Sequence, residues 1–314
     1  MVTELLARGH PVIATGRNGT IGARLAAMGA RFCPSDLARD DLTGLLDGVA
    51  HVFHLAALSA PYGREADFVA TNVLATRRLL DAARAAGCAS FVFTSTPSIY
   101  ARPQDQIGIT ETTSLPPKLA NAYARTKLAA EQAVLDAHGT AMACIALRPR
   151  AILSPFDTAL LPRLLRAADK GVMPLPHDGR ALLEPTDARD VVSALLAAQA
   201  RAVDAGGRAY NISGGVAVSL RDLVTHLFGL LGKEVRLQPV PRCLLLAMGT
   251  VMERLAATMR LPEPPLTAYG ALILGYSQTF DLSSARQSMD WAPRHHPFDS
   301  MAWVLSERLS CDKS

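Results

Sequence analysis

Short β-branched runs alternate with long Ala/Leu-rich stretches through the first half of this 314-residue chain. The apolar runs predict strands, and the stretches between them carry apolar residues at helical spacing. Strands separated by long helices predict a parallel, doubly wound α/β sheet, because parallel strands need a long crossover connection. The expected strands are residues 11–15, 51–57, 90–95 and 142–148, and the two clearest helices are 69–87 and 120–139, each ending at a glycine.

The pattern changes after Pro149, where helices, prolines and short strands such as 208–213 follow one another without regular alternation. We therefore expect residues 1–150 to form the sheet domain. Residues 151–314 should form mainly a smaller lobe, with some strands that return to the sheet. Such a lobe is expected over the carboxyl edge of the strands, where sheets of this kind bind ligands.

Composition excludes several classes of protein. The chain is 49% hydrophobic and 19% charged, as in ordered globular proteins. Its net charge of +4 is spread over scattered arginines, so we expect no nucleic-acid partner. Five widely spaced cysteines without a CxxC pair indicate reduced thiols and a cytoplasmic location. We expect neither a signal peptide nor a membrane span, and no grouping of residues predicts a metal site.

A glycine triplet, Gly16, Gly19 and Gly22, follows directly on the expected strand 11–15. Asp36 lies about 20 residues beyond the first of these glycines. A loop that binds dinucleotide phosphates has the same local signs: a strand, a GxxGxxG pattern, a helix and an acid at that distance.

The length of the following helix argues against this interpretation. Gly29 comes seven positions after Gly22, and a helix that short rises only about 10 Å. A crossover has to run back along a strand of about 17–20 Å. We therefore expect the triplet to be turn residues and the strand 11–15 to be the second strand of its sheet. The first strand and its glycine loop would then precede Met1.

Tyr123 and Lys127 are four positions apart on the expected helix 120–139, so their side chains share a face. A phenol has an ordinary pKa of about 10, and a neighbouring ammonium favours its anion. We expect Lys127 to lower the pKa of Tyr123, making it an acid–base residue for an alcohol or a ketone. An exposed helix face without chemistry is the alternative for this pair taken alone.

Ser95, Thr96 and Ser98 come just past the expected strand 90–95, at the ligand-binding edge of the sheet. A hydroxyl there is placed to bond a substrate oxygen beside Tyr123. Ordinary strand-end turn chemistry is the alternative for these three residues.

Several segments, in this order, resemble the extended short-chain dehydrogenase/reductase superfamily of the NAD-dependent epimerase/dehydratase type. They are residues 54–57 (HLAA), 71–83, 91–100, 123–131 (YARTKLAAE) and 147–149 (LRP). Residues 184–198, 210–215 and 264–294 are similar to its 3β-hydroxysteroid dehydrogenase-like branch. The resemblance runs from residue 1 to about 305. It implies a Rossmann-type fold with 1–150 as the dinucleotide-binding domain. It also implies hydride transfer between nicotinamide and a secondary alcohol or ketone of a hydrophobic substrate.

The resemblance assigns the catalytic roles residue by residue. It makes Tyr123 the acid–base residue, Lys127 the residue that lowers its pKa and holds the nicotinamide ribose, and Thr96 the catalytic hydroxyl. Asn72 matches the helix residue near the active site, unless it lies on the helix surface. The resemblance implies a small hydrophobic substrate and allows a homodimer.

The expected cofactor is NADP or NAD, and the resemblance places its contacts at three strand ends. Asp36 and Leu37 would flank the adenine, while Leu55, Ala56 and Ala57 would line the cofactor after the third strand. Arg17 closes the strand where related enzymes carry an acid for NAD or a base for NADP. Because arginine recognises phosphate with a rigid fork of donors, we favour NADP. A solvated turn arginine is the alternative.

Two departures from the family pattern leave other functions open. The TGxxGxxG loop is absent from its usual place. Arg150 and Ala151 replace residues where nucleotide-sugar epimerases usually have an Asn. The replaced Asn argues against a nucleotide-sugar epimerase or dehydratase with a retained cofactor, which stays one alternative. The missing loop favours a second alternative, a non-catalytic dinucleotide-binding homologue.

Two features of the second half have structural interpretations. Asp187 and Asp190 are expected to cap the helix that follows them. The Met-rich stretch 244–259 is expected to be a core helix, with a hydrophobic lid over the substrate as the alternative.

Overall fold

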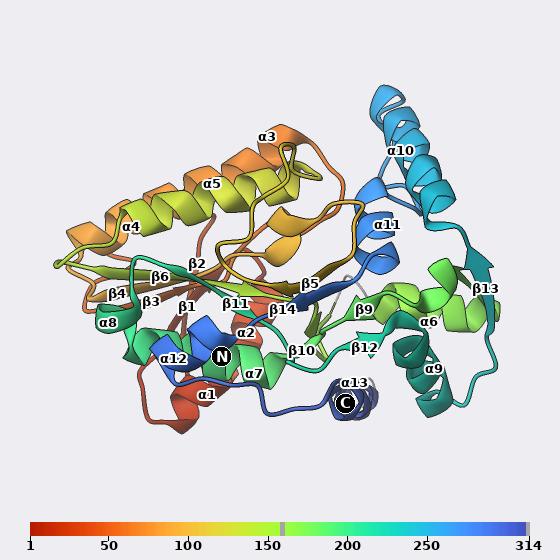
Figure 1. The fold of residues 1–314 in the computed structure, drawn as a ribbon. Helices are drawn as coiled ribbons and strands as arrows, with labels where there is room; N and C mark the ends of the chain where they lie inside the picture. Colours follow the sequence, from red (N-terminus) through yellow and green to blue (C-terminus); the bar gives the residue numbers. More distant parts are fainter. Residues whose placement is uncertain (158–160, 312–314) are drawn as a thin grey trace.

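The computed structural model describes residues 1–157 and 161–311, and it is built around a four-stranded parallel sheet (Figure 1). The strand order is β11-β6-β4-β3, and every pairing is parallel, which confirms the expected parallel α/β fold. The strands are β3 (His51–His54), β4 (Ser90–Thr94), β6 (Ala143–Pro149) and β11 (Ala209–Ile212), close to the bounds expected from the apolar runs.

Alternating side chains of the central strand β4 divide the core into two layers. Phe91 and Phe93 pack with α4 (Ala75–Ala85) and α5 (Ala122–Asp136). Val92 packs in a second cluster with side chains of α7 (Ala188–Ala200). Successive strand residues face opposite sides, so a wholly apolar strand needs cover on both. Figure 1 shows α4 and α5 on one face of the sheet and α7 with α12 (Ser283–Met289) on the other.

A second, two-stranded parallel sheet pairs β1 (Ile13–Gly16) with β2 (Arg31–Pro34). No ladder within the described residues joins it to β3, so the sheet is interrupted there.

The expectation that the segment after the glycine triplet is too short for a crossover is wrong. The helix α2 (Gly19–Ala27) connects β1 to β2 in parallel. Its nine residues rise about 13 Å, and strands of four residues also span about 13 Å. The strands are shorter than the typical strand, so the short helix suffices. Within α2, Gly22 lets the helix lie against Phe32, whose ring is 2.2 Å from where a Cβ would stand.

The residues beyond 150 form a third hydrophobic cluster, apart from the two beside the main sheet, and some of them return to the sheets. Their core joins α6 (Leu161–Lys170), α9 (Leu220–Leu230) and α13 (Pro297–Cys311) around the parallel pair β8 (Val172–Pro176) and β13 (Arg236–Val240). Strand β11 joins β6, and β14 (Gln278–Phe280) joins β5 (Gln106–Ile109). The division into 1–150 and 151–314 stays a prediction.

The shorter elements connect these layers. They are α1 (Val2–Ala7), α3 (Glu65–Phe68), the π-helix η1 (Val69–Leu74), the 3₁₀ turns η2 (Pro97–Tyr100) and η3 (His177–Gly179), β7 (Ile152–Leu153), β9 (Leu182–Leu183), β10 (Thr186–Asp187), α8 (Ala202–Ala205) and β12 (Val218–Ser219).

Asp187 caps α7 by accepting the Arg189 N–H, as expected. Asp190 differs, because its carboxylate accepts from the backbone of Arg294 and from the backbone and ring of His295.

The helix α10 (Arg242–Thr258) is not the expected core helix. Only its Leu245, Gly249 and Ala256 are buried, and it packs on α11 (Ala268–Gly275). Figure 1 shows it standing away from the sheet. The exposed apolar side chains along it are Leu244, Met248, Val251, Leu255 and Met259. Among the described residues, no helix is both long and apolar enough to cross a bilayer.

The contact at Gly249 sets how closely α10 and α11 approach. A Cβ on this residue would lie 2.6 Å from the carbonyl carbon of Thr267 and 2.7 Å from the nitrogen of Ala268, which are backbone atoms that cannot turn aside. We expect Gly249→Ala to lower the free energy of unfolding by about 1–3 kcal/mol, measured by urea denaturation.

Gly229→Ala in α9 is the matched control, because nothing lies within 4 Å of the added Cβ. Alanine there should raise stability by about 0.5–1 kcal/mol through helix propensity. Equal effects of the two substitutions would contradict the close approach of α10 and α11.

Candidate active site

The candidate site lies at the carboxyl ends of β3, β4 and β6. Because these strands are parallel neighbours, the residues that follow them meet at one edge of the sheet. Leu55 follows β3, Ser95 and Thr96 follow β4, and Arg150 follows β6.

The first turn of α5 brings Tyr123 to this edge. Asn121 caps the helix by accepting the Ala124 N–H at 2.9 Å. Tyr123 is half-buried as a residue, and its phenol lies beside the hydroxyls of Ser59 and Thr96. The sequence analysis predicted that Tyr123 and Thr96 lie together. It did not predict Ser59, because the loop after β3 has no recognisable pattern.

The hydroxyl contacts continue from Thr96 into the second half of the chain. Thr96 Oγ1 donates to Ser98 Oγ at 2.8 Å, and Ser98 Oγ lies 2.5 Å from the Tyr269 phenol. Tyr269 stands near the start of α11, 171 positions along the chain from Ser98. We name Tyr123, Thr96, Ser98 and Tyr269 the hydroxyl chain. No local signal in the sequence links its two ends.

Lys127 lies one turn after Tyr123 and is buried, with 2% of its surface exposed. Its Nζ donates to the Thr94 carbonyl at 2.6 Å and lies 4.0 Å from the centre of the Phe93 ring. Burial lowers the pKa of Lys127 to about 7, which the charge of Glu131 partly opposes. The ammonium is therefore held by a strand carbonyl and an aromatic face.

The expected lowering of the Tyr123 pKa is not found. Burial raises the pKa of this phenol above its ordinary value, and the hydrogen bonds with Ser59 and Thr96 only partly oppose the rise. The physical reason is desolvation, which disfavours the phenolate. The structure thus favours the neutral phenol, a proton donor.

Asn72 is 1% exposed, so the helix-surface alternative for it is wrong. It lies in the π-helix η1, a type of distortion frequent at functional sites. Its Oδ1 accepts the Leu58 N–H at 2.8 Å, and its Nδ2 donates to the Leu58 carbonyl at 3.2 Å and to Thr126 Oγ1 at 3.1 Å. It ties the loop that carries Ser59 to the helix that carries Tyr123.

The residues expected around a dinucleotide are only partly brought together. Arg17 Nη1 lies 3.8 Å from Asp36 Oδ2, so the ends of β1 and β2 meet. Leu37 is buried, and its side chain packs in the core beside α4. Leu55 is 44% exposed despite being apolar. Ala56 is exposed and Ala57 partly so.

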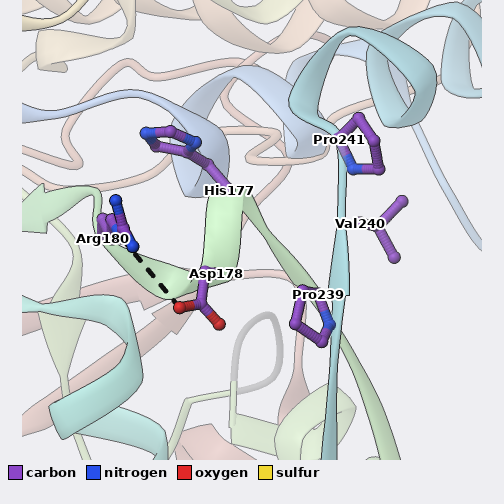
Figure 2. Close-up of a pocket in the computed structure, with 6 residues that line it drawn as sticks. All are labelled: His177, Asp178, Arg180, Pro239, Val240 and Pro241. Atoms are coloured by element: carbon purple, nitrogen blue, oxygen red, sulfur yellow. Dashed lines mark ion pairs between the residues drawn. The ribbon is translucent and has the colours of Figure 1, made fainter.

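A cavity of about 410 Å³ lies elsewhere, in the second half of the chain (Figure 2). None of the expected site residues lines it. Its walls are His177, Asp178, Arg180, Pro239, Val240 and Pro241. In residues 1–157 and 161–311, no three metal-ligating side chains gather into a group.

The buried Lys127 makes stability depend on pH. Its pKa is about 7 when folded and about 10.4 in an unfolded chain. Between these values the unfolded chain binds more protons, so the free energy of unfolding rises with pH. The loss of stability caused by burying the Lys127 ammonium is complete below about pH 7 and disappears as the pH rises towards about 10.

We expect Lys127→Met to stabilise the chain most at or below about pH 7, by up to a few kcal/mol, because one pKa unit corresponds to about 1.4 kcal/mol. The gain should shrink towards about pH 10 in urea denaturation. Lys118→Met, at an exposed position, should show a constant difference. A constant difference for Lys127→Met as well would show that the ammonium is not desolvated.

Comparison with known proteins supplies the family. The model of the NAD dependent epimerase/dehydratase family matches residues 1–213. A 2-alkyl-3-oxoalkanoate reductase from Stenotrophomonas maltophilia (strain K279a) is 33% identical over 92% of this chain and 89% of its own length. A sterol-4-alpha-carboxylate 3-dehydrogenase (decarboxylating) from Bos taurus is 32% identical over 68% of this chain and 61% of its own length.

Among solved structures, MoeE5 in complex with UDP-glucuronic acid and NAD superimposes with a TM-score of 0.76 at 27% identity. The match covers 98% of this chain and 94% of MoeE5. These comparisons confirm the expected extended short-chain dehydrogenase/reductase superfamily. The chain belongs to the NAD-dependent epimerase/dehydratase family and is an NAD(P)-dependent oxidoreductase.

Proposed function

We propose that this protein reduces a ketone of a small hydrophobic substrate to a secondary alcohol, using Tyr123 as the proton donor. The observation that carries the proposal is the placement of the Tyr123 phenol beside the Thr96 hydroxyl at the carboxyl edge of the sheet, with Lys127 one turn further along α5. A reacting oxygen placed between the two hydroxyls is bonded by both.

Each residue has a role that follows from its surroundings. Tyr123 gives its proton to the carbonyl oxygen, and burial keeps the phenol protonated until then, because it raises the phenol's pKa. Thr96 orients the same oxygen. At neutral pH the phenol therefore carries the proton that reduction of a ketone requires. Ser59 helps to hold the phenol in place.

The strand ends fit a nicotinamide dinucleotide. Exposed apolar surface at Leu55 and Ala56 follows β3, and a cationic side chain, Arg17, follows β1. Lys127, held through the Thr94 carbonyl, would contact the nicotinamide ribose. When bound, the dinucleotide supplies the hydride. The residues of this chain position the substrate and supply the proton.

The names of the relatives support an apolar substrate. One is a reductase of 2-alkyl-3-oxoalkanoates, and the other is a dehydrogenase of a sterol carboxylate. Each name describes an oxygen function on a largely hydrocarbon skeleton. We infer the same class of substrate here.

Replacing Tyr123 with Phe removes the proton donor and little else. We expect kcat with NADPH and a long-chain 3-oxoalkanoate to fall by about 10²–10⁴-fold, with the Kd for NADPH within a few-fold of the parent protein. Stopped-flow kinetics and calorimetry measure the two quantities. Tyr276→Phe, whose ring stacks on Arg242, should leave both unchanged.

Three results would overturn the assignment. Full turnover by Tyr123→Phe would remove the proposed proton donor. A cofactor that copurifies and supports turnover without added NADP(H) would instead favour the epimerase or dehydratase alternative. Binding of neither NADPH nor NADH would favour an inactive homologue over either enzyme.

We also propose that NADP is the preferred cofactor, because Arg17 closes β1 with an exposed guanidinium. Arg17→Ala should lower the ratio of kcat/KM for NADPH to kcat/KM for NADH by about 10- to 100-fold, the cost of a charged hydrogen bond. Arg39→Ala is the control, since Arg39 also approaches Asp36, at 4.0 Å, but follows a different strand. An unchanged ratio in Arg17→Ala would assign Arg17 to a solvated turn.

A further inference from the structure

Arg150 is held firmly at the reacting edge of the sheet. Its N–H donates to the Ile212 carbonyl at 2.8 Å, and its carbonyl accepts the Thr186 hydroxyl at 2.5 Å. The next residue, Ala151, has a φ of 39°. A non-glycine residue rarely adopts this left-handed conformation, and such strain concentrates at functional sites. The chain therefore turns away from β6 directly after Arg150.

The guanidinium of Arg150 is buried with its hydrogen-bonding capacity unfilled. The residue is 6% exposed, and Nη2 donates to the Ile273 carbonyl at a long 3.4 Å. Its buried Nε has no hydrogen-bond partner within the part of the chain that the structure describes. A buried donor without an acceptor is costly, and a buried cation without an anion costs more.

Glu184 does not satisfy this cation by direct contact. Its charge acts on Arg150, while its carboxylate accepts the Ser213 hydroxyl at 2.5 Å and the Phe280 N–H at 3.2 Å. No ion pair within 4.0 Å joins Arg150 to an acid of the described residues. Within those residues, the guanidinium thus has no carboxylate in contact with it.

Arg150 also adjoins the proposed catalytic groups. It lies close enough to Tyr269, the last member of the hydroxyl chain, for its charge to oppose the rise that burial causes in the pKa of that phenol. Thr96 follows β4 and Arg150 follows β6, and these strands are hydrogen-bonded neighbours. Neighbouring strands lie about 4.8 Å apart. The residues that follow the two strands therefore lie side by side at the same edge of the sheet.

We propose that Arg150 binds a carboxylate of the substrate, carried on the carbon next to the reacting carbon. This rests on the proposed function and names its substrate class as 3-oxo or 3-hydroxy acids with apolar chains. The planar guanidinium fork matches two carboxylate oxygens, and Nε is a free donor of that fork. Tyr269 adds a phenol beside the anion. The reacting oxygen then lies on Tyr123 and Thr96.

The test compares 3-hydroxydodecanoate with its methyl ester as substrates for NADP-dependent oxidation. The ratio of kcat/KM for the acid to kcat/KM for the ester should fall about 10- to 100-fold in Arg150→Met. Arg150→Lys, which keeps the charge but loses the fork, should give an intermediate ratio. Arg180→Met, on an exposed side chain, is the control and should leave the ratio within about twofold.

Binding of dodecanoate, measured by calorimetry, tests the site without turnover. We expect Arg150→Met to weaken it about 10- to 100-fold and Arg180→Met to leave it unchanged. Equal losses for acid and ester would assign Arg150 a purely structural role and overturn the proposal. If the parent protein oxidises neither compound but binds dodecanoate through Arg150, the proposed reaction fails while the carboxylate site stands. If dodecanoate does not bind, the carboxylate site fails.

Discussion

Burial of polar and charged groups at one edge of the sheet is the constraint on which the rest of this site depends. Lys127, Thr96 and Arg150 are each at most 6% exposed, and all three follow or adjoin the ends of β4 and β6. In such surroundings, a group is neutralised, hydrogen-bonded or left in need of a ligand. Lys127 has a carbonyl and an aromatic ring, Thr96 has two hydroxyls, and Arg150 has an unfilled donor. The edge is thus prepared for an anionic, oxygen-bearing ligand.

The same burial determines which proton transfers are available. Desolvation raises the pKa of Tyr123 and lowers that of Lys127, so both groups are shifted towards their neutral forms. A neutral phenol holds a proton that it can donate to a carbonyl oxygen as that oxygen gains negative charge. A bound anion near Arg150 would replace lost solvation for that guanidinium. The charge of the substrate and the protonation of Tyr123 therefore both depend on the poorly hydrated edge of the sheet that holds Arg150 and Lys127.

Much of this arrangement is local and was predictable. The alternation of apolar runs and helical stretches fixed the parallel sheet, and the spacing of Tyr123 and Lys127 placed both on one helix close to Thr96. The rest depends on contacts distant in sequence. Tyr269 joins the site through the packing of α11, and Ser59 through a loop without a pattern. The pKa of Tyr123 was misjudged because a spacing of four residues places an ammonium nearby but says nothing of burial. The α2 crossover was misjudged because strand length was taken as typical.

The irregular helix that precedes α4 explains how these distant parts keep their register. A π-helix turn contains one more residue than an α-helical turn, so η1 directs Asn72 towards the loop after β3 rather than along the α4 face. From there, the amide side chain bonds both backbone groups of Leu58 and the Thr126 hydroxyl. Ser59 is the residue after Leu58, and Lys127 is the residue after Thr126. One buried amide thus fixes the loop hydroxyl and the α5 side chains relative to each other. The backbone of Asn72 is linked to the main sheet as well, because its carbonyl accepts the Thr76 hydroxyl, which is bonded in turn to the ring of His54 in β3.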